Sequence, residues 1–86
     1  MTLSKTLQAL SDPNRQKILE LLKKKNLVVS EIAKHFNITL PSLSHHLNKL
    51  KEADLVTSER KGQKIIYSLN LSAFEEAIKY IYKFKK

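Results

Sequence analysis

Residues 30–69 constrain the fold more than any other part of this 86-residue chain. The pattern predicts a short helix over residues 31–36, a tight turn, a second helix that begins after Thr39, and two strands that turn at Gly62. This order places one helix between a tight turn and a basic ribbon, and the remaining elements have to pack around that unit.

The size and composition of the chain favour one small domain that covers residues 1–86. A domain of this length buries only about 60% of the surface that its unfolded chain exposes. Because cysteine is absent, neither a disulfide nor cysteine-ligated zinc can supplement the core. Oligomerisation is therefore the remaining way to hide more apolar surface.

The charge of the chain favours a polyanionic partner. The net charge is +8 and the pI is near 9.8, which indicates nucleic acid first and an acidic membrane surface second. The first residues lack the long apolar run of a signal peptide, and no stretch approaches the roughly 18 apolar residues of a membrane span. We therefore expect a cytoplasmic protein without stable membrane insertion.

Three further helices are predicted outside residues 30–69. Leucines at helical spacing mark a short first helix, Asp12 caps a second one that ends near the lysines at 23–25, and Ser72 with Glu75 forms a capping box for a last helix. Apolar residues span roughly 200° of the last helix, whereas a helix on the side of a monomer needs a stripe of about 100°. The surplus predicts a partner, most simply a second copy of the chain.

The helix that begins after Thr39 has two different faces. Its apolar face contains Leu40, Leu43, Leu47 and Leu50. Short hydrogen-bonding groups dominate the opposite face, which contains Pro41, Ser42, His45, Asn48, Lys49 and Glu52. We expect Thr39 to cap this helix, Asn37 to end the preceding helix in a left-handed conformation, and Asp54 to end this one with slight backbone strain.

Together these elements predict a mainly α fold with a small β-wing: four helices, two strands and a last helix, arranged as a winged helix-turn-helix. Such a fold offers one helix to the DNA major groove and a basic loop to the flanking backbone. The chain has no cysteine, no glycine-rich phosphate loop and no carboxylate pair in an evident pocket, which argues against an enzyme. The alternative is a winged-helix protein-interaction module, although such a helix usually offers large apolar or aromatic anchors.

Several short segments, in this order and spacing, resemble the ArsR-type winged-helix repressors. They are Ala9-Leu10-Ser11-Asp12-Pro13-Asn14-Arg15, Ile18-Leu19, Ser30-Glu31-Ile32-Ala33, Ser44-His45-His46-Leu47, Leu50, Glu52-Ala53-Asp54-Leu55-Val56, Arg60-Lys61-Gly62 and Tyr67-Ser68-Leu69. No single segment is specific, but the set covers residues 7–84. Within the family the chain is most similar to the metal-independent SdpR-type autorepressors.

The resemblance implies a homodimeric transcriptional repressor in which the first and last helices form the dimer interface. The residues expected there are Leu3, Leu7, Phe74, Ile78, Ile81 and Tyr82. A self-regulated promoter is the expected target. The release signal stays open between a protein anti-repressor, dilution of the repressor, and a small ligand at the dimer interface.

Many members of the family sense metals, but this chain departs from their pattern. Val28 and Ser30 occupy the positions of the family's sensor cysteines, and neither is a plausible ligand there. The second family site needs histidine on the last helix, which has only carboxylates. His45 and His46 are adjacent on a helix and point about 100° apart, so they cannot easily share one metal. We expect no metal site and no cofactor, with His46 packed and His35 exposed.

Nine residues are predicted to contact DNA as the dimer places its two reading helices in successive major grooves of an inverted repeat. Ser42, His45 and Asn48 are the base-reading candidates, with solvent exposure as the alternative for His45. Thr39, Ser44 and Lys49 are expected near phosphates, and Arg60, Lys61 and Lys64 are expected to add wing contacts to the backbone or the minor groove.

Overall fold

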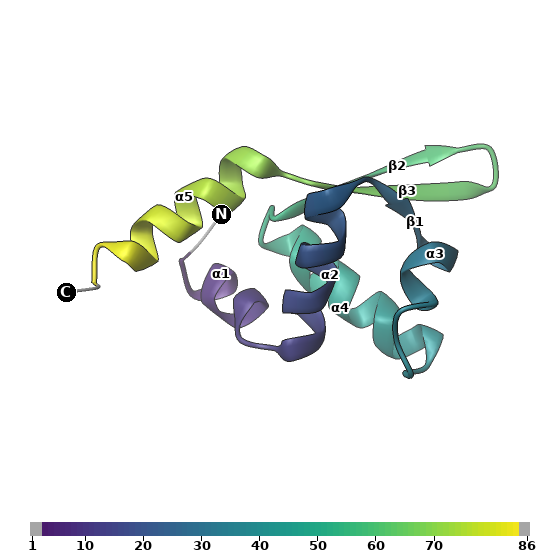
Figure 1. Ribbon diagram of the computed structural model, residues 1–86, viewed down its shortest axis with the longest axis horizontal. Helices are drawn as coiled ribbons and strands as arrows, with labels where there is room; N and C mark the ends of the chain where they lie inside the picture. The colour runs from purple at the N-terminus through teal and green to yellow at the C-terminus, as the bar shows by residue number, and fades with distance from the viewer. Residues whose placement is uncertain (1–2, 85–86) are drawn as a thin grey trace.

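The computed structural model describes residues 3–84 and shows, within them, a mainly helical chain with one small sheet (Figure 1). The elements in chain order are α1 (Leu3–Leu10), α2 (Pro13–Lys24), β1 (Leu27–Val28), α3 (Val29–Ala33), α4 (Leu40–Glu52), β2 (Val56–Lys61), β3 (Lys64–Leu69) and α5 (Leu71–Tyr82). In Figure 1, α5 extends from one end of the molecule, and the β2–β3 hairpin reaches toward the other. Helix, turn, helix and hairpin follow in the predicted order, which confirms the winged helix-turn-helix fold.

The sheet contains a short strand that the sequence did not predict. Its strand order is β1-β3-β2, and both pairings are antiparallel. β1 places Leu27 and Val28 opposite Tyr67 and Ile66 of β3. A two-residue strand is too short to show the alternation by which strands are found in a sequence. At the hairpin turn, Gly62 adopts a φ of 63°, a left-handed conformation that glycine takes without steric penalty.

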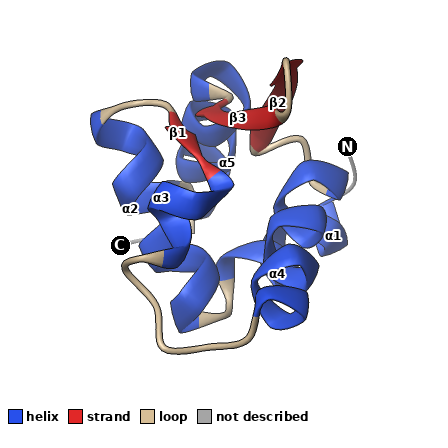
Figure 2. Ribbon diagram, turned by 90° about the vertical axis from the view of Figure 1, so that its right-hand side faces the viewer, coloured by secondary structure: helices blue, strands red, loops and turns tan. Residues whose placement is uncertain are grey.

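An apolar core joins the helices to the base of the hairpin, and Figure 2 shows the strands along one side of the helices. The largest fully buried side chains are Ile18, Ile32, Leu43, Leu47, Leu50 and Leu55. Three of these come from α4, as the leucine spacing predicted. Leu40 was expected beside them, but this was wrong, because its side chain is 63% exposed. Leu40 is the first residue of α4, and the core begins only one turn further along the helix.

Helix ends were predicted correctly where a local feature of the sequence decides them. Asp12 caps α2 by accepting hydrogen bonds from the backbone N–H groups of Asn14 and Arg15. Thr39 caps α4 by accepting from the backbone N–H three residues later. Asp54, just after α4, has a φ of 60°, which is the strained left-handed conformation expected there.

Three other expectations about helix ends were wrong. The third helix spans Val29–Ala33 rather than residues 31–36, because strand β1 leads directly into it. Asn37 does not take the left-handed conformation, and the chain after α3 continues in tighter turns instead. The cap of α5 is Asn70, whose side chain accepts from the N–H three residues later, so Ser72 lies inside the helix.

Candidate DNA-binding interface

Helix α4 presents a polar face because its leucines are held in the core. Those leucines, apart from the first one, are at most 1% exposed. On the other side of the helix, His45 and Asn48 are exposed and Ser42 is half-buried. The backbone N–H of Ser42 donates to Thr39 Oγ1 at 3.2 Å, which orders the first turn. The three predicted base-reading side chains therefore lie along the outer side of one firmly packed helix.

The residues predicted to meet phosphates lie around this face. Thr39 is exposed at the start of α4, and Lys49 is half-buried with its Nζ atom 3.8 Å from Glu52 Oε1. Ser44 is exposed on the edge of α4 that faces the hairpin. An open hollow of about 400 Å³ lies between α4 and the hairpin, and its lining includes Ser44 and Lys64. The structure thus brings α4 and the hairpin to two sides of one concave surface.

The hairpin carries three exposed basic side chains. Arg60 Nε donates to the carbonyl oxygen of Gly62 at 3.3 Å, and Lys61 Nζ lies 3.7 Å from Glu59 Oε1. Lys61 and Lys64 face each other directly across the turn. Like charges opposite each other destabilise a hairpin, so an anion at this position, such as a phosphate, would relieve the repulsion.

His46 is buried, as predicted, and lies in a polar cluster behind α4. Its side chain Nδ1 is 3.1 Å from Arg15 Nη1 and 3.8 Å from Asp12 Oδ1. Burial by itself would raise the pKa of Asp12. Hydrogen bonds from the N–H groups of Arg15 and Asn14, with the basic side chains of His46 and Arg15, outweigh burial and lower that pKa below its ordinary value. The sequence indicated Asp12 as a cap, but it gave Arg15 no role of its own.

The three histidines differ in their surroundings. His45 meets His46 edge to face, with ring centroids 5.9 Å apart, and His35 is exposed. Val28 is half-buried and Ser30 is exposed; these are the two positions that the resemblance matched to the family's sensor cysteines. Within residues 3–84, histidine, aspartate and glutamate side chains nowhere gather in a group of three or more that could hold a metal ion.

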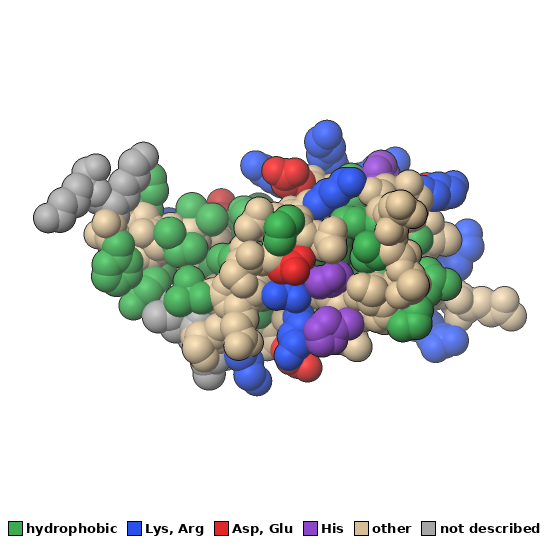
Figure 3. Space-filling view, turned by 90° about the horizontal axis from the view of Figure 1, so that it is seen from below, with side chains coloured by type: hydrophobic (Ala, Val, Ile, Leu, Met, Phe, Trp, Pro, Cys, Tyr) green, Lys and Arg blue, Asp and Glu red, His purple; other side chains and the backbone are tan. Residues whose placement is uncertain are grey.

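A second surface, at the end of the molecule opposite the hairpin, is apolar. Figure 3 shows hydrophobic side chains gathered at the end where α1 and α5 lie. Four residues predicted for the dimer interface are 42% to 64% exposed, namely Leu7, Ile78, Ile81 and Tyr82. Phe74 is half-buried against the core, and the side chain of Leu3 lies outside the described residues. Leu71, Tyr80 and Phe84 are exposed too; the sequence placed them on the wide apolar face of the last helix but not among the interface residues.

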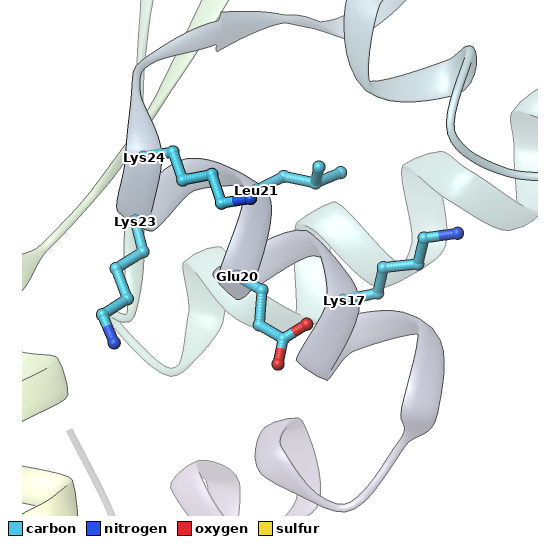
Figure 4. Close-up of a pocket in the computed structure, with 5 residues that line it drawn as sticks. All are labelled: Lys17, Glu20, Leu21, Lys23 and Lys24. Carbon is cyan, nitrogen blue, oxygen red and sulfur yellow. The ribbon is translucent and has the colours of Figure 1, made fainter.

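An open hollow of about 620 Å³ lies along α2. It is lined by Lys17, Glu20, Leu21, Lys23 and Lys24, whose side chains Figure 4 shows spread apart along the helix. Lys17 Nζ donates to the carbonyl oxygen of His35 at 2.6 Å. This lining has three lysines, one carboxylate and one leucine. In the described part of the chain, no helix is both long and apolar enough to cross a membrane.

The sequence matches a protein-family model over residues 12–58, and that model describes bacterial regulatory proteins of the arsR family. The matched residues contain α2, α3, α4 and the start of β2. The chain belongs to the ArsR family. Its members regulate transcription and are not enzymes, so the resemblance found in the sequence and the expectation of a non-enzymatic protein are confirmed.

Individual relatives agree with this assignment. The transcriptional repressor SdpR of Bacillus subtilis is 49% identical over 90% of this chain and 86% of its own length. An arsenical resistance operon repressor of Staphylococcus xylosus is 43% identical over 79% of this chain and 65% of its own length. The crystal structure of the ArsR family transcriptional regulator RHA00566 superposes with a TM-score of 0.85 at 27% identity, covering 94% of this chain and 84% of that one. This ArsR-family chain is therefore a DNA-binding transcriptional repressor, homologous to SdpR.

Proposed function

We propose that this repressor reads an inverted-repeat operator in its own promoter with the outer face of α4. The observation that carries the proposal is the exposure of His45 and Asn48 on a helix whose leucines are buried. An asparagine side chain can bond adenine through two hydrogen bonds, while histidine and serine accept or donate single bonds to base edges. Ser42, His45 and Asn48 are the base-reading residues of the proposal.

Backbone contacts would position α4 in the groove without reading sequence. Thr39, Ser44 and Lys49 surround the reading face, and we assign them to phosphates. Arg60, Lys61 and Lys64 on the hairpin would hold the flanking backbone, because their charges are exposed and two of them are paired across the turn. A net charge of +8 supports this electrostatic share of the binding energy.

An inverted repeat requires two copies of α4, and we assign the dimer interface to α1 and α5. Leu7, Ile78, Ile81 and Tyr82 expose apolar surface at the end of the molecule formed by these helices, with Phe74 beside them, and Leu3 completes the proposed interface. Large exposed apolar patches mark interaction sites in small domains. A two-fold axis through this end would place the two α4 helices in successive major grooves, about 34 Å apart.

The proposed repressor works without metal, in the cytoplasm, where its DNA target would be. Val28 and Ser30 stand at the sensor-cysteine positions, and the carboxylates of α5, Glu75 and Glu76, are exposed without a histidine on that helix. A signal other than metal would then release the DNA. One candidate is a protein anti-repressor that covers the apolar end or the reading face.

The deciding experiment is fluorescence anisotropy with a labelled duplex from upstream of the gene for this chain and a scrambled duplex as control. The titration is repeated across a salt series, with zinc and with a chelator. We expect tight, salt-dependent, sequence-selective binding that zinc leaves unchanged. Selective binding that zinc weakens would overturn the metal-independent part of the proposal. Equal weak binding to both duplexes would overturn autorepression, and a salt-insensitive protein partner without DNA binding would favour an interaction module.

A further inference from the structure

Helix α1 is short, and its buried side chains are small. It has eight residues, and an isolated helix of that length is not stable in water. Among its described side chains, Thr6 and Ala9 are buried, and both are small. α1 packs against α2 and α4. Hydrogen bonds that tie its last turn to those two helices therefore add directional contacts to this packing.

Arg15 ties the last turn of α1 to both of those helices. Arg15, in the first turn of α2, donates from Nε to the Ala9 carbonyl oxygen at 3.0 Å and from Nη2 to the Gln8 carbonyl oxygen at 2.8 Å. Both carbonyls belong to the last turn of α1, and the Gln8 carbonyl oxygen also accepts from the N–H and the hydroxyl of Ser11 just after the helix. The third contact runs from Nη1 to His46 Nδ1 at 3.1 Å. Because the guanidinium is a rigid planar fork, these three bonds fix α1 and α4 relative to each other.

The bond to α4 ends on His46, close to other charged and titratable groups. Arginine can only donate, so His46 Nδ1 is the acceptor in this contact. The charged and titratable groups that face this ring are Arg15, Asp12 at 3.8 Å from Nδ1, and the neighbouring ring of His45. His45 belongs to the proposed reading face. The tie from α1 therefore ends one residue away from the surface that meets DNA.

We propose that Arg15 and His46 are positioning residues that set the half-site spacing the repressor accepts. The inference rests on the proposed function, since it needs a dimer joined through α1 and α5. With α1 in the dimer interface and α4 in the groove, the Arg15–His46 bond fixes the distance and angle between the two reading helices. One inserted base pair moves a half-site by about 3.4 Å and rotates it by about a tenth of a turn. A rigid pair of helices rejects such a change, whereas a loosened pair tolerates it.

The main test substitutes His46→Phe, which keeps a ring of similar size, removes the acceptor, and leaves the bonds between Arg15 and α1 in place. Binding is measured on the preferred inverted repeat, on the same repeat with one base pair added or removed, and on a single half-site. The parent chain should bind its best spacing about tenfold more tightly than a spacing changed by one base pair, which is similar to the cost of one mismatched base pair. His46→Phe should reduce that ratio to below about threefold while half-site affinity stays within about twofold.

Matched variants separate positioning from folding. Gln16→Ala removes a bond from Gln16 Nε2 to the Leu10 carbonyl at 2.7 Å, so it loosens α2 from α1 without removing the bond to α4, and it should keep the spacing preference. Arg15→Lys keeps the charge but loses the fork, and it should lose the preference. His46→Gln retains an acceptor and should therefore keep more of the spacing preference than His46→Phe does. Thermal unfolding of each variant identifies any that fail to fold, and His46→Gln then serves as the reporting variant.

Two results would overturn the inference, and they differ. If the parent chain prefers one spacing and both His46 variants keep that ratio while losing affinity equally on all duplexes, Arg15 and His46 merely stabilise the fold. If the parent chain itself shows no spacing preference, the proposed dimeric operator is wrong, and the inference fails with it.

Discussion

Helices α4 and α5 both have an apolar face, but the folded chain buries the apolar face of α4 and leaves much of that of α5 exposed. In α4, Leu43, Leu47 and Leu50 are almost completely buried, and the polar side of the helix is left in solvent. In α5, only two alanines are buried, while Ile78 and Ile81 remain more than 40% exposed. The apolar face of α4 is buried within one chain, and the face left exposed is polar. Much of the apolar face of α5 remains exposed.

This difference shows why a polar face and an apolar face indicate different partners. Exposed hydrogen-bonding groups on a fixed helix can be matched to base edges without further folding. Exposed isoleucine and tyrosine side chains are stabilised when another surface covers them and removes them from water. The comparison predicts that substitutions in α5 act through assembly, and that substitutions in α4 and the hairpin act directly on DNA.

The largest effect is expected for Ile78→Lys in α5. A charge in the centre of the apolar end should weaken the dimer by about 2–4 kcal/mol, the range of interface hot spots. Analytical ultracentrifugation should show a monomer at concentrations where the parent chain is dimeric, and binding to the inverted repeat should fall with it. Glu76→Lys adds a positive charge at an exposed polar position of the same helix and should leave the dimer intact. A dimeric Ile78→Lys variant would exclude this face.

The next effect is expected for Asn48→Ala in α4. Loss of a two-bond contact to adenine should reduce specificity by about 1–3 kcal/mol, because base contacts carry the sequence information. The measurement is the ratio of specific to non-specific affinity at fixed salt, with circular dichroism to confirm folding. An unchanged ratio would remove Asn48 from the reading face.

A smaller and different effect is expected for Lys61→Ala on the hairpin. Binding to all sequences should weaken alike, and the slope of log affinity against log salt should fall by about 1, because one phosphate contact is lost. Glu59→Gln is the matched change, since it removes the carboxylate 3.7 Å from Lys61 Nζ and should raise affinity slightly. A loss confined to the operator would contradict a backbone contact.

The smallest effect is expected for Asp12→Asn, and it should disappear in acid. The fold lowers the pKa of Asp12, so its charge contributes stability above the unfolded-state pKa, and that contribution is lost as the pH falls through the lowered folded-state pKa. Asparagine also caps a helix but carries no charge, so the variant should be slightly less stable than the parent near neutral pH, and the two should converge as the pH falls below about 4. Urea unfolding at several pH values measures this. An identical pH dependence would mean that the Asp12 charge has no net effect.

The sequence by itself determined the features that depend on neighbours along the chain. Asp12 and Thr39 cap helices through backbone groups two or three residues away, Gly62 turns the hairpin, and Asp54 takes a positive φ where the chain leaves α4. Leucine spacing predicted which side of α4 is buried. The residue types and their order were therefore enough for the fold and for the polar face proposed to read DNA.

Only the tertiary structure decided the features that depend on distant residues. Strand β1 forms because its two residues pair with β3, which lies about forty positions later in the chain. Leu40 is exposed because the core begins one turn beyond it. The contact between Arg15 and His46 joins residues 31 positions apart. No local pattern encodes such a pairing, because it arises when packing brings the end of α1, the start of α2 and the middle of α4 to one point.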